Sequence, residues 1–420
     1  MAPHTSIGPT PAHLHDDQVI ALLQSGAHAH LMIAHFGEEE YRELSHLAKL
    51  AATRRNKRGR LVFILPGIMG SRLAMKRGRT LDLYWLHPHA IAEGQLAQLA
   101  LPGSRALRPI GVMLPGYLKM KLMLEVSGFK PVLHAFDWRA DLERNARALI
   151  RAIERSGASN VIVVAHSMGA LIARAAMRFE SKRRIKQLVQ IGAPNEGSFA
   201  PVQALRAVYP TVRKIAALDR AHSAEQLARD VFLTLPGLYQ LLPRPRSPQE
   251  LDLFDAANWP TDLAPNVRLL EQARKVRARL VKPDGRCQVI AGFGQDTIVS
   301  IERTGEVFSY EIRPEGDGTV PLERARWEGA RTWYARENHG ALSTSTAVLS
   351  ALIDILREGE TARLASSLPD RADVREARWI TDADLRRHAC MKVDWDALTI
   401  ESRRRILEPI FTPEFVAPTS

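Results

Sequence analysis

Cysteine is scarce in this sequence, long apolar runs are missing, and the first residues lack the pattern of a secretory signal. The two cysteines among 420 residues, Cys287 and Cys390, cannot build a disulfide scaffold, and neither has a second ligand at a zinc-site spacing. No run of about 18 apolar residues occurs, so the sequence predicts no transmembrane helix. The first residues, MAPHTSIGPTPAHLHDDQ, contain no positive region followed by an apolar stretch. We therefore expect no secretory signal and a cytoplasmic location.

The charge balance is basic. The chain has 58 Lys and Arg against 46 Asp and Glu, a formal net charge of +12, which can favour nucleic acid, anionic lipid or acidic ligands. The densest run, RRNKRGR at 54–60, is interpreted first as a solvated linker and second as a binding patch. No zinc-knuckle, RNP-like or helix-turn-helix pattern accompanies it, so we do not expect nucleic acid as a partner. Peripheral contact with an anionic membrane stays open.

Apolar spacing divides the chain into three regions. Residues 1–60 are predicted to form a helical N-terminal extension, with helical spacing over 17–52 that breaks at Gly26 and Gly37. Residues 61–358 alternate short apolar strands with helical stretches, which is typical of a mostly parallel α/β sheet with helices on both faces. Residues 359–420 are polar and are predicted to form a helical C-terminal extension. The strands are expected at 61–65, 132–136, 160–165, 187–191, 287–291 and 332–335, and the helices at 117–126, 141–156, 168–180 and 343–357.

A segment without strand patterns interrupts the middle region. Over about 198–281 the sequence contains helical pieces and proline-rich turns, which predicts a helical cap inserted between two strands of the sheet. At the end of the strand at 132–136, Asp137 and Arg139 are expected to form a local structural ion pair or, alternatively, a ligand contact.

The histidine pairs near the N-terminus, such as His28 and His30, are two residues apart and would not share a helix face. We therefore expect no metal site.

One short segment has the pattern of a nucleophile elbow. Residues 165–169 read Ala-His-Ser-Met-Gly, directly after the expected strand at 160–165 and at the start of the expected helix at 168–180. An elbow needs a strand, a tight turn and a helix, with small residues two positions either side of the nucleophile. Ala165 and Gly169 meet that need, so Ser167 is the predicted nucleophile, held in a strained backbone conformation.

A glycine-rich turn is the expected second half of the site. The first strand runs into Leu65-Pro66-Gly67-Ile68-Met69-Gly70-Ser71, where backbone N–H groups can face the elbow. In this architecture the oxyanion is held by the N–H after the nucleophile and by one N–H from this early loop. The sequence therefore predicts an oxyanion hole made by the backbone of Ile68 and Met168.

The nucleophile needs a histidine base and a carboxylate, expected in the chain order Ser, acid, His. His339, in Asn-His-Gly between a strand and a helix, is the predicted base, whereas His222 in the cap and His388 in the tail are weaker candidates. Two acids compete. Asp317 lies in the loop EGDGTVP at 315–321, and Asp296 follows the expected strand at 287–291. The pattern alone does not choose between them.

Taken together in chain order, these segments resemble the lecithin:cholesterol acyltransferase family of α/β-hydrolases. The resemblance is carried by LPGIMGSRL (65–73), FDWR (136–139), AHSMG (165–169), IGAPNEGS (191–198), LPGLYQLLP (235–243), GDGTVP (316–321) and NHG (338–340). It implies an α/β-hydrolase fold, lipid acyl esters as substrates, and Asp317 rather than Asp296 as the acid. The two terminal extensions lie outside it.

The function expected from these residues is serine-dependent acyl transfer, and the resemblance implies that the substrates are lipid esters. An acyl-enzyme on Ser167 gives a hydrolase when water resolves it and an O-acyltransferase when another alcohol does, without any cofactor. The cap residues Phe232, Leu235, Leu238 and Tyr239 are expected to contact the acyl chain, unless they form the cap's own core. Two alternatives remain: a soluble carboxylesterase for small esters, and a non-catalytic module that docks on membrane or nucleic acid.

Overall fold

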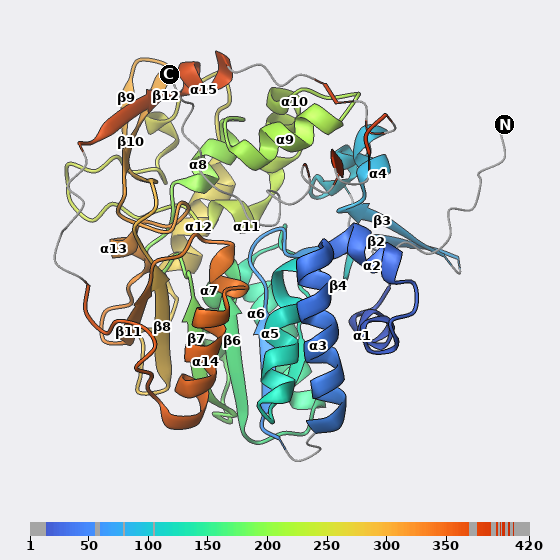
Figure 1. Ribbon diagram of the computed structural model, residues 1–420. Helices are drawn as coiled ribbons and strands as arrows, with labels where there is room; N and C mark the ends of the chain where they lie inside the picture. Colours follow the sequence, from blue (N-terminus) through green and yellow to red (C-terminus); the bar gives the residue numbers. More distant parts are fainter. Residues whose placement is uncertain are drawn as a thin grey trace.

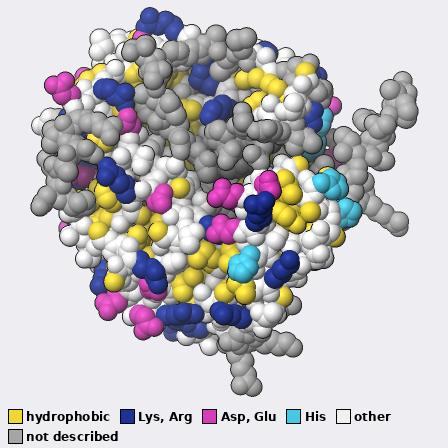
Figure 2. All heavy atoms as spheres, in the orientation of Figure 1, with side chains coloured by type: hydrophobic (Ala, Val, Ile, Leu, Met, Phe, Trp, Pro, Cys, Tyr) yellow, Lys and Arg dark blue, Asp and Glu magenta, His cyan; other side chains and the backbone are white. Residues whose placement is uncertain are grey.

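The structure, a computed structural model, describes most of the chain. The described residues are 14–54, 59–78, 80–103, 106–368, 376–387, 392–393, 395, 397–399, 402–403 and 406. Most of the basic run at 54–60 therefore lies outside the described residues, as do Cys390 and His388. On the face drawn in Figure 2, the described Lys and Arg side chains are interspersed with Asp and Glu rather than gathered in one patch.

A six-stranded parallel sheet forms the centre of the molecule (Figure 1). Its strand order is β11-β8-β7-β6-β1-β5, and every pairing is parallel. The predicted parallel sheet is thereby confirmed; the expected strands differ from the observed ones by one or two residues at their ends, except that the strand expected at 132–136 lies at 130–133. The bounds are β1 (Leu61–Leu65), β5 (Lys130–Leu133), β6 (Val161–His166), β7 (Ile185–Ile191), β8 (Cys287–Gly292) and β11 (Arg331–Ala335).

Helices cover both faces of this sheet because alternate strand residues point to opposite sides. On one face, Val62 and Ile64 of β1 pack with α5 (Leu114–Val126) and α14 (Thr346–Glu358). On the other face, Phe63 and Leu65 pack with α6 (Leu142–Arg155) and α7 (Met168–Phe179). The strands are apolar at consecutive positions because each of their faces is buried.

The N-terminal helices form an additional layer outside α5, as Figure 1 shows. They are α1 (Asp16–Ser25), α2 (Ala29–Phe36) and α3 (Glu38–Arg54), and the chain breaks helical structure at the two predicted glycines. Their apolar residues share a core with Leu114, Leu118 and Leu122, which lie four residues apart on one side of α5. The ammonium of Lys121, buried on α5, lies 2.8 Å from the Asp16 carboxylate on α1.

The segment between β7 and β8 is helical, as the sequence predicts. No residue of 198–281, all of which the structure describes, is in a strand. The segment lies over the end of the sheet where β6 and β7 finish (Figure 1). Its longer helices are α8 (Ala200–Leu205), α9 (Pro210–Leu218), α10 (Ala224–Asp230), α11 (Pro236–Tyr239) and α12 (Val267–Ala278).

Two small antiparallel sheets were not predicted from the sequence. One has the order β3-β2-β4 and is inserted after β1, with the short helix α4 (Pro88–Ala92) between β3 and β4 in the chain. The other has the order β12-β10-β9, and its β12 lies in the tail that we expected to be helical throughout. Their bounds are β2 (Ser71–Arg77), β3 (Thr80–Trp85), β4 (Arg108–Val112), β9 (Thr297–Thr304), β10 (Val307–Arg313) and β12 (Arg378–Thr381).

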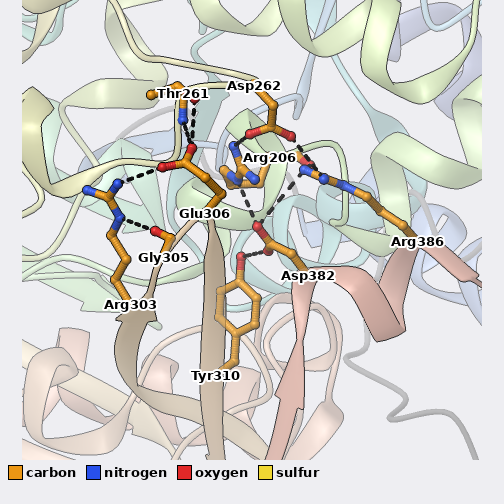
Figure 3. A network of polar contacts seen from close by, with 9 residues as sticks. All are labelled: Arg206, Thr261, Asp262, Arg303, Gly305, Glu306, Tyr310, Asp382 and Arg386. Carbon is orange, nitrogen blue, oxygen red and sulfur yellow. Dashed lines mark hydrogen bonds and ion pairs between the residues drawn. The ribbon is translucent and has the colours of Figure 1, made fainter.

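A buried polar network attaches the tail to the cap (Figure 3). Arg206 directly follows α8, and its guanidinium donates to Asp382 at 2.8 Å and also to Asp262. Asp382 opens α15 (Asp382–Arg387) and accepts a hydrogen bond from the phenol of Tyr310 on β10. The network thus joins three segments that are far apart in the sequence.

No helix among the described residues is long and apolar enough to cross a membrane.

Candidate active site

Ser167 lies at a sharp turn between β6 and α7. Its backbone has φ 52° and ψ −124°, a conformation that non-glycine residues rarely adopt. The neighbouring strand loop passes so close that a Cβ on Gly169 would lie 2.5 Å from the carbonyl oxygen of Pro66. The turn therefore has the strained geometry and the small-residue requirement expected of a nucleophile elbow.

Ser167, His339 and Asp317 are brought together across long distances in the chain. The Nε2 atom of His339 lies 2.9 Å from Oγ of Ser167, and its Nδ1 lies 2.7 Å from Oδ2 of Asp317. All three side chains are buried. A carboxylate on Nδ1 keeps the proton there, which leaves the Nε2 lone pair facing the serine hydroxyl.

The Asp317 carboxylate is itself held by backbone donors. Oδ1 of Asp317 accepts hydrogen bonds from the N–H groups of Thr319 at 3.0 Å and Val320 at 2.7 Å. The N–H of His339 donates to the main-chain oxygen of Asp317 at 2.8 Å. The loop after residue 315 thus fixes both the carboxylate and the start of the segment that carries the histidine.

The competing candidates lie elsewhere. Asp296 is partly exposed and forms an ion pair with Arg378 on β12, not with His339. His222 in the cap lies 2.9 Å from Asp219. Of the two acids that the pattern left open, the structure therefore brings Asp317 to the imidazole.

The glycine-rich turn lies against the elbow. A Cβ on Gly67 would be 3.1 Å from Cβ of Ser167, so the loop approaches the serine through a residue without a side chain. The loop is held in place by the indole N–H of Trp85, which donates to the oxygen of Met69 at 2.7 Å, and by Gly70, whose N–H donates to the Gly67 oxygen at 3.1 Å. Ile68 lies in this loop, and Met168 is the first residue of α7.

Two buried residues of the site were missed in the sequence. Tyr117 accepts from the N–H of Gly67 at 2.8 Å, and its hydroxyl lies 2.8 Å from Nδ1 of His166. Nε2 of His166 lies 3.0 Å from the main-chain oxygen of His339. Burial, and secondarily the nearby His339, lower the pKa of His166 to about 3. His166 stands inside the AHSMG segment, but nothing in the pattern indicates what its ring contacts.

A cavity of about 100 Å³ opens at Ser167. It is lined by the glycine-rich turn, by Trp85 and Tyr117, and by cap residues that include Leu238 and Leu241. None of the described residues lining it is Lys, Arg, Asp or Glu. Its lining is thus mostly apolar, although it includes the hydroxyl-bearing residues Tyr209, Thr211 and Thr319.

Only one of the four cap residues predicted to contact an acyl chain lines this cavity. Leu238 does, but Phe232, Leu235 and Tyr239 are buried inside the cap. The Tyr239 hydroxyl donates to the oxygen of Leu233 at 3.0 Å and accepts from the N–H of Asn266 at 2.9 Å. For these three residues the prediction is corrected, because they form the cap's own core.

Asp137 and Arg139 pair with each other. Both nitrogen–oxygen contacts between the side chains are 2.9 Å, and the guanidinium also donates to the main-chain oxygens of Leu99 and Leu107. Arg139 is 1% exposed and does not line the cavity. The contacts match those of the structural ion pair.

Among the described residues, no three His, Cys, Asp or Glu side chains are grouped so that they could hold a metal ion.

Comparison with known proteins gives a family match and several similar folds. The model of the family described as Lecithin:cholesterol acyltransferase matches residues 117–262. A search of curated proteins finds no match. The solved structures include a Tle4–Tli4 complex, with 14% identity, coverage of 72% of this chain and 100% of that chain, and a TM-score of 0.46.

Two further structures are similar over about the same share of this chain. The mature form of the Bacillus licheniformis lipase BlEst2 has 13% identity over 72% of this chain and 93% of that chain, with a TM-score of 0.39. The phospholipase PlaB of Legionella pneumophila has 11% identity over 71% and 60%, with a TM-score of 0.34. Together with the parallel sheet, the family match confirms the resemblance in the motifs: the chain has the α/β-hydrolase fold and is similar over residues 117–262 to the lecithin:cholesterol acyltransferase family.

Proposed function

We propose that this protein is a serine-dependent hydrolase or O-acyltransferase of lipid acyl esters. The family match supports a lipid ester hydrolase or acyltransferase in general terms. The observation that carries the finer proposal is the hydrogen-bonded series Ser167–His339–Asp317 at the base of an apolar cavity.

The proposed reaction has two acyl-transfer steps. Oγ of Ser167 attacks the ester carbonyl carbon while Nε2 of His339 takes its proton, and Asp317 stabilises the imidazolium. The tetrahedral intermediate collapses, the bond to the alcohol oxygen breaks, and the alcohol leaves with the proton from His339. Water or a second alcohol then repeats the sequence on the acyl-enzyme and frees Ser167.

The backbone around the nucleophile supports stabilisation of the oxyanion. We assign this role to the N–H groups of Ile68 and Met168, because Ile68 lies in the loop against the serine and Met168 begins the helix that follows it. Loss of one such donor in other acyl-transfer enzymes costs about 10²–10³-fold in rate. Both donors belong to the backbone, so they depend on loop position rather than on side-chain identity.

The cavity supports an uncharged acyl part as the group bound next to the serine. A phosphate in the cavity would require cationic or strongly donating partners, and the described lining residues include no Lys or Arg, with the histidines His166 and His339 as the ionisable nitrogen groups. We therefore propose that an acyl chain occupies the apolar walls and that any charged head group stays outside.

A serine-directed phosphonate probe tests the proposal directly. Wild type should be labelled, Ser167→Ala should not, and Ser343→Ala, which removes another buried serine hydroxyl, should be labelled at the wild-type rate. Incubation with a radiolabelled phospholipid and an alcohol acceptor then separates the two reactions. Free fatty acid alone means a hydrolase, and a new ester means a transferase. Labelling that persists in Ser167→Ala would refute the proposed nucleophile.

A second candidate is a carboxylesterase with a fixed cap that acts on small esters. It is favoured by the burial of the apolar residues at 231–242, which leaves them inside the cap rather than on its surface. Activity against a short-chain ester across its micellar concentration distinguishes the two. A jump in rate favours a cap that opens on lipid, and smooth saturation favours the fixed cap.

A further inference from the structure

Two buried side chains connect the glycine-rich turn to the histidine of the proposed active site. The N–H of Gly67 donates to the Tyr117 hydroxyl at 2.8 Å, and that hydroxyl lies 2.8 Å from Nδ1 of His166. Nε2 of His166 lies 3.0 Å from the main-chain oxygen of His339. Neither Tyr117 nor His166 takes part in the acyl-transfer steps proposed above, although both line the cavity.

The direction of each hydrogen bond follows from the groups at the two ends. A carbonyl oxygen only accepts, so Nε2 of His166 carries a proton and donates to His339. The ring is neutral at neutral pH because burial lowers its pKa to about 3, so Nδ1 is an acceptor. The Tyr117 hydroxyl therefore donates to Nδ1 while it accepts from Gly67. Each polar atom of this series has a partner.

We propose that Tyr117 and His166 are positioning residues that hold the oxyanion loop and the catalytic histidine in a fixed relation across Ser167. This inference rests on the proposed function. The series runs from Gly67, next to Ile68, to the backbone of His339, and both of its ends lie against Ser167. A displacement of about 1 Å in such a site can lower the rate about 100-fold. A rigid connection between these two segments would therefore keep kcat high by preventing such displacements.

Helix α5, which carries Tyr117, also packs against the N-terminal helices. Tyr117 and Met120 lie on the side of α5 that packs on the sheet, whereas Leu114, Leu118 and Leu122 pack against α1 and α3. On that outer side Lys119 also lies 2.7 Å from Glu43 of α3. Helix α5 thus packs between the sheet on one side and the N-terminal helices on the other.

The test uses Tyr117→Phe in the full-length protein. Phenylalanine keeps the ring but removes the hydroxyl, so Gly67 and His166 each lose a partner. Tyr334→Phe is the matched control, because Tyr334 is a buried tyrosine on β11 that does not line the cavity at Ser167. The measurements are kcat and KM for a soluble carboxylic ester, with the folded fraction of each variant taken from its thermal unfolding curve.

We expect Tyr117→Phe to lower kcat by about 10- to 100-fold with KM changed less than about threefold, and Tyr334→Phe to leave both near wild type. His166→Gln, which keeps an amide donor for the His339 oxygen, should retain more kcat than His166→Leu. The double variant Tyr117→Phe/His166→Leu should be no slower than the slower single variant, because both interrupt one series.

Failure of this inference and failure of the proposed function give different results. If Ser167→Ala is inactive while folded Tyr117→Phe keeps its kcat within twofold of wild type, the positioning role is wrong and the proposed function stands. If the kcat losses of Tyr117→Phe and His166→Leu multiply, the two residues do not act through one series. If Ser167→Ala keeps the activity, both proposals are wrong.

Discussion

Acidification should destabilise this fold through a histidine that is buried without charge. His166 is 6% exposed, and burial first, then the neighbouring His339, lower its pKa from 6.5 to about 3. In the unfolded chain the same ring titrates at its ordinary value. Between pH 6.5 and 3 the unfolded chain therefore binds a proton that the native protein does not. The free energy of unfolding falls as the pH falls through this window.

The size of the effect follows from the width of the window. Each pH unit below 6.5 lowers the free energy of unfolding by up to about 1.4 kcal/mol per such histidine. At pH 4.5 His166 alone costs about 2.7 kcal/mol, a large part of the roughly 5–15 kcal/mol that stabilises a typical domain. The pKa values of His35 and His134 are also lowered, to about 4, mainly by burial. These two side chains are only half-buried, so we expect smaller contributions from them.

Urea denaturation between pH 7.5 and 4.5 measures this contribution, with wild type compared with His166→Gln. The glutamine variant should be less stable at pH 7.5 because the series through Tyr117 is broken. Its stability should nevertheless fall less steeply with pH than that of wild type, by about 1.4 kcal/mol per pH unit below pH 6.5. Carboxylates titrate in both proteins, so the difference between the two curves isolates His166. Parallel curves over the whole range would refute the reasoning.

Three further predictions concern the other buried charges. Asp317→Asn should lower kcat by about 10⁴-fold, as loss of the acid does in other triads, whereas Asp296→Asn should change it less than about threefold; equal effects in an ester assay would contradict the assignment of the acid. Arg139→Ala leaves the Asp137 carboxylate buried without its partner and should lower the free energy of unfolding by about 3–5 kcal/mol, with KM unchanged in the folded fraction, whereas a selective rise in KM would indicate a ligand contact. Asp382→Asn removes the charge that faces the buried Arg206, so it should lower the free energy of unfolding by about 3 kcal/mol and speed proteolysis after β10. An unchanged digestion pattern would show that the network does not hold the tail.

The strands of the large sheet and the residues proposed as nucleophile and base could be picked out in the sequence because their signals are local. An apolar run of five or six residues predicts a buried strand wherever it stands, as at 61–65 and 161–166. The elbow needs small residues within two positions of Ser167, so its pattern is contained in five letters. The structure explains that requirement, since a side chain at Gly169 would overlap the loop after β1.

The choice of acid could not be made from such signals. Asp296 and Asp317 both follow apolar segments, and their loops lie side by side, because the N–H of Gln295 donates to the Gly316 oxygen at 2.9 Å. What separates the two is a long-range contact: β12 brings Arg378 to Asp296, while Asp317 remains facing His339. Strand β12, which carries Arg378, is in the polar tail, where the sequence shows no strand pattern, so the contact of Asp296 could not be predicted.

The supports of the site were missed for the same physical reason. The loop that carries Ile68 is held on one side by Trp85 and on the other by Tyr117, and each contact joins residues well separated in the chain. Tryptophan and tyrosine in an apolar stretch predict burial, but not the carbonyl or N–H that their polar atom will meet. Trp85 lies in the small sheet β3-β2-β4 and Tyr117 on a helix held by the N-terminal layer. The proposed nucleophile and base are therefore marked by local patterns, whereas the position of the loop beside them depends on contacts with segments that no motif of the chain marks.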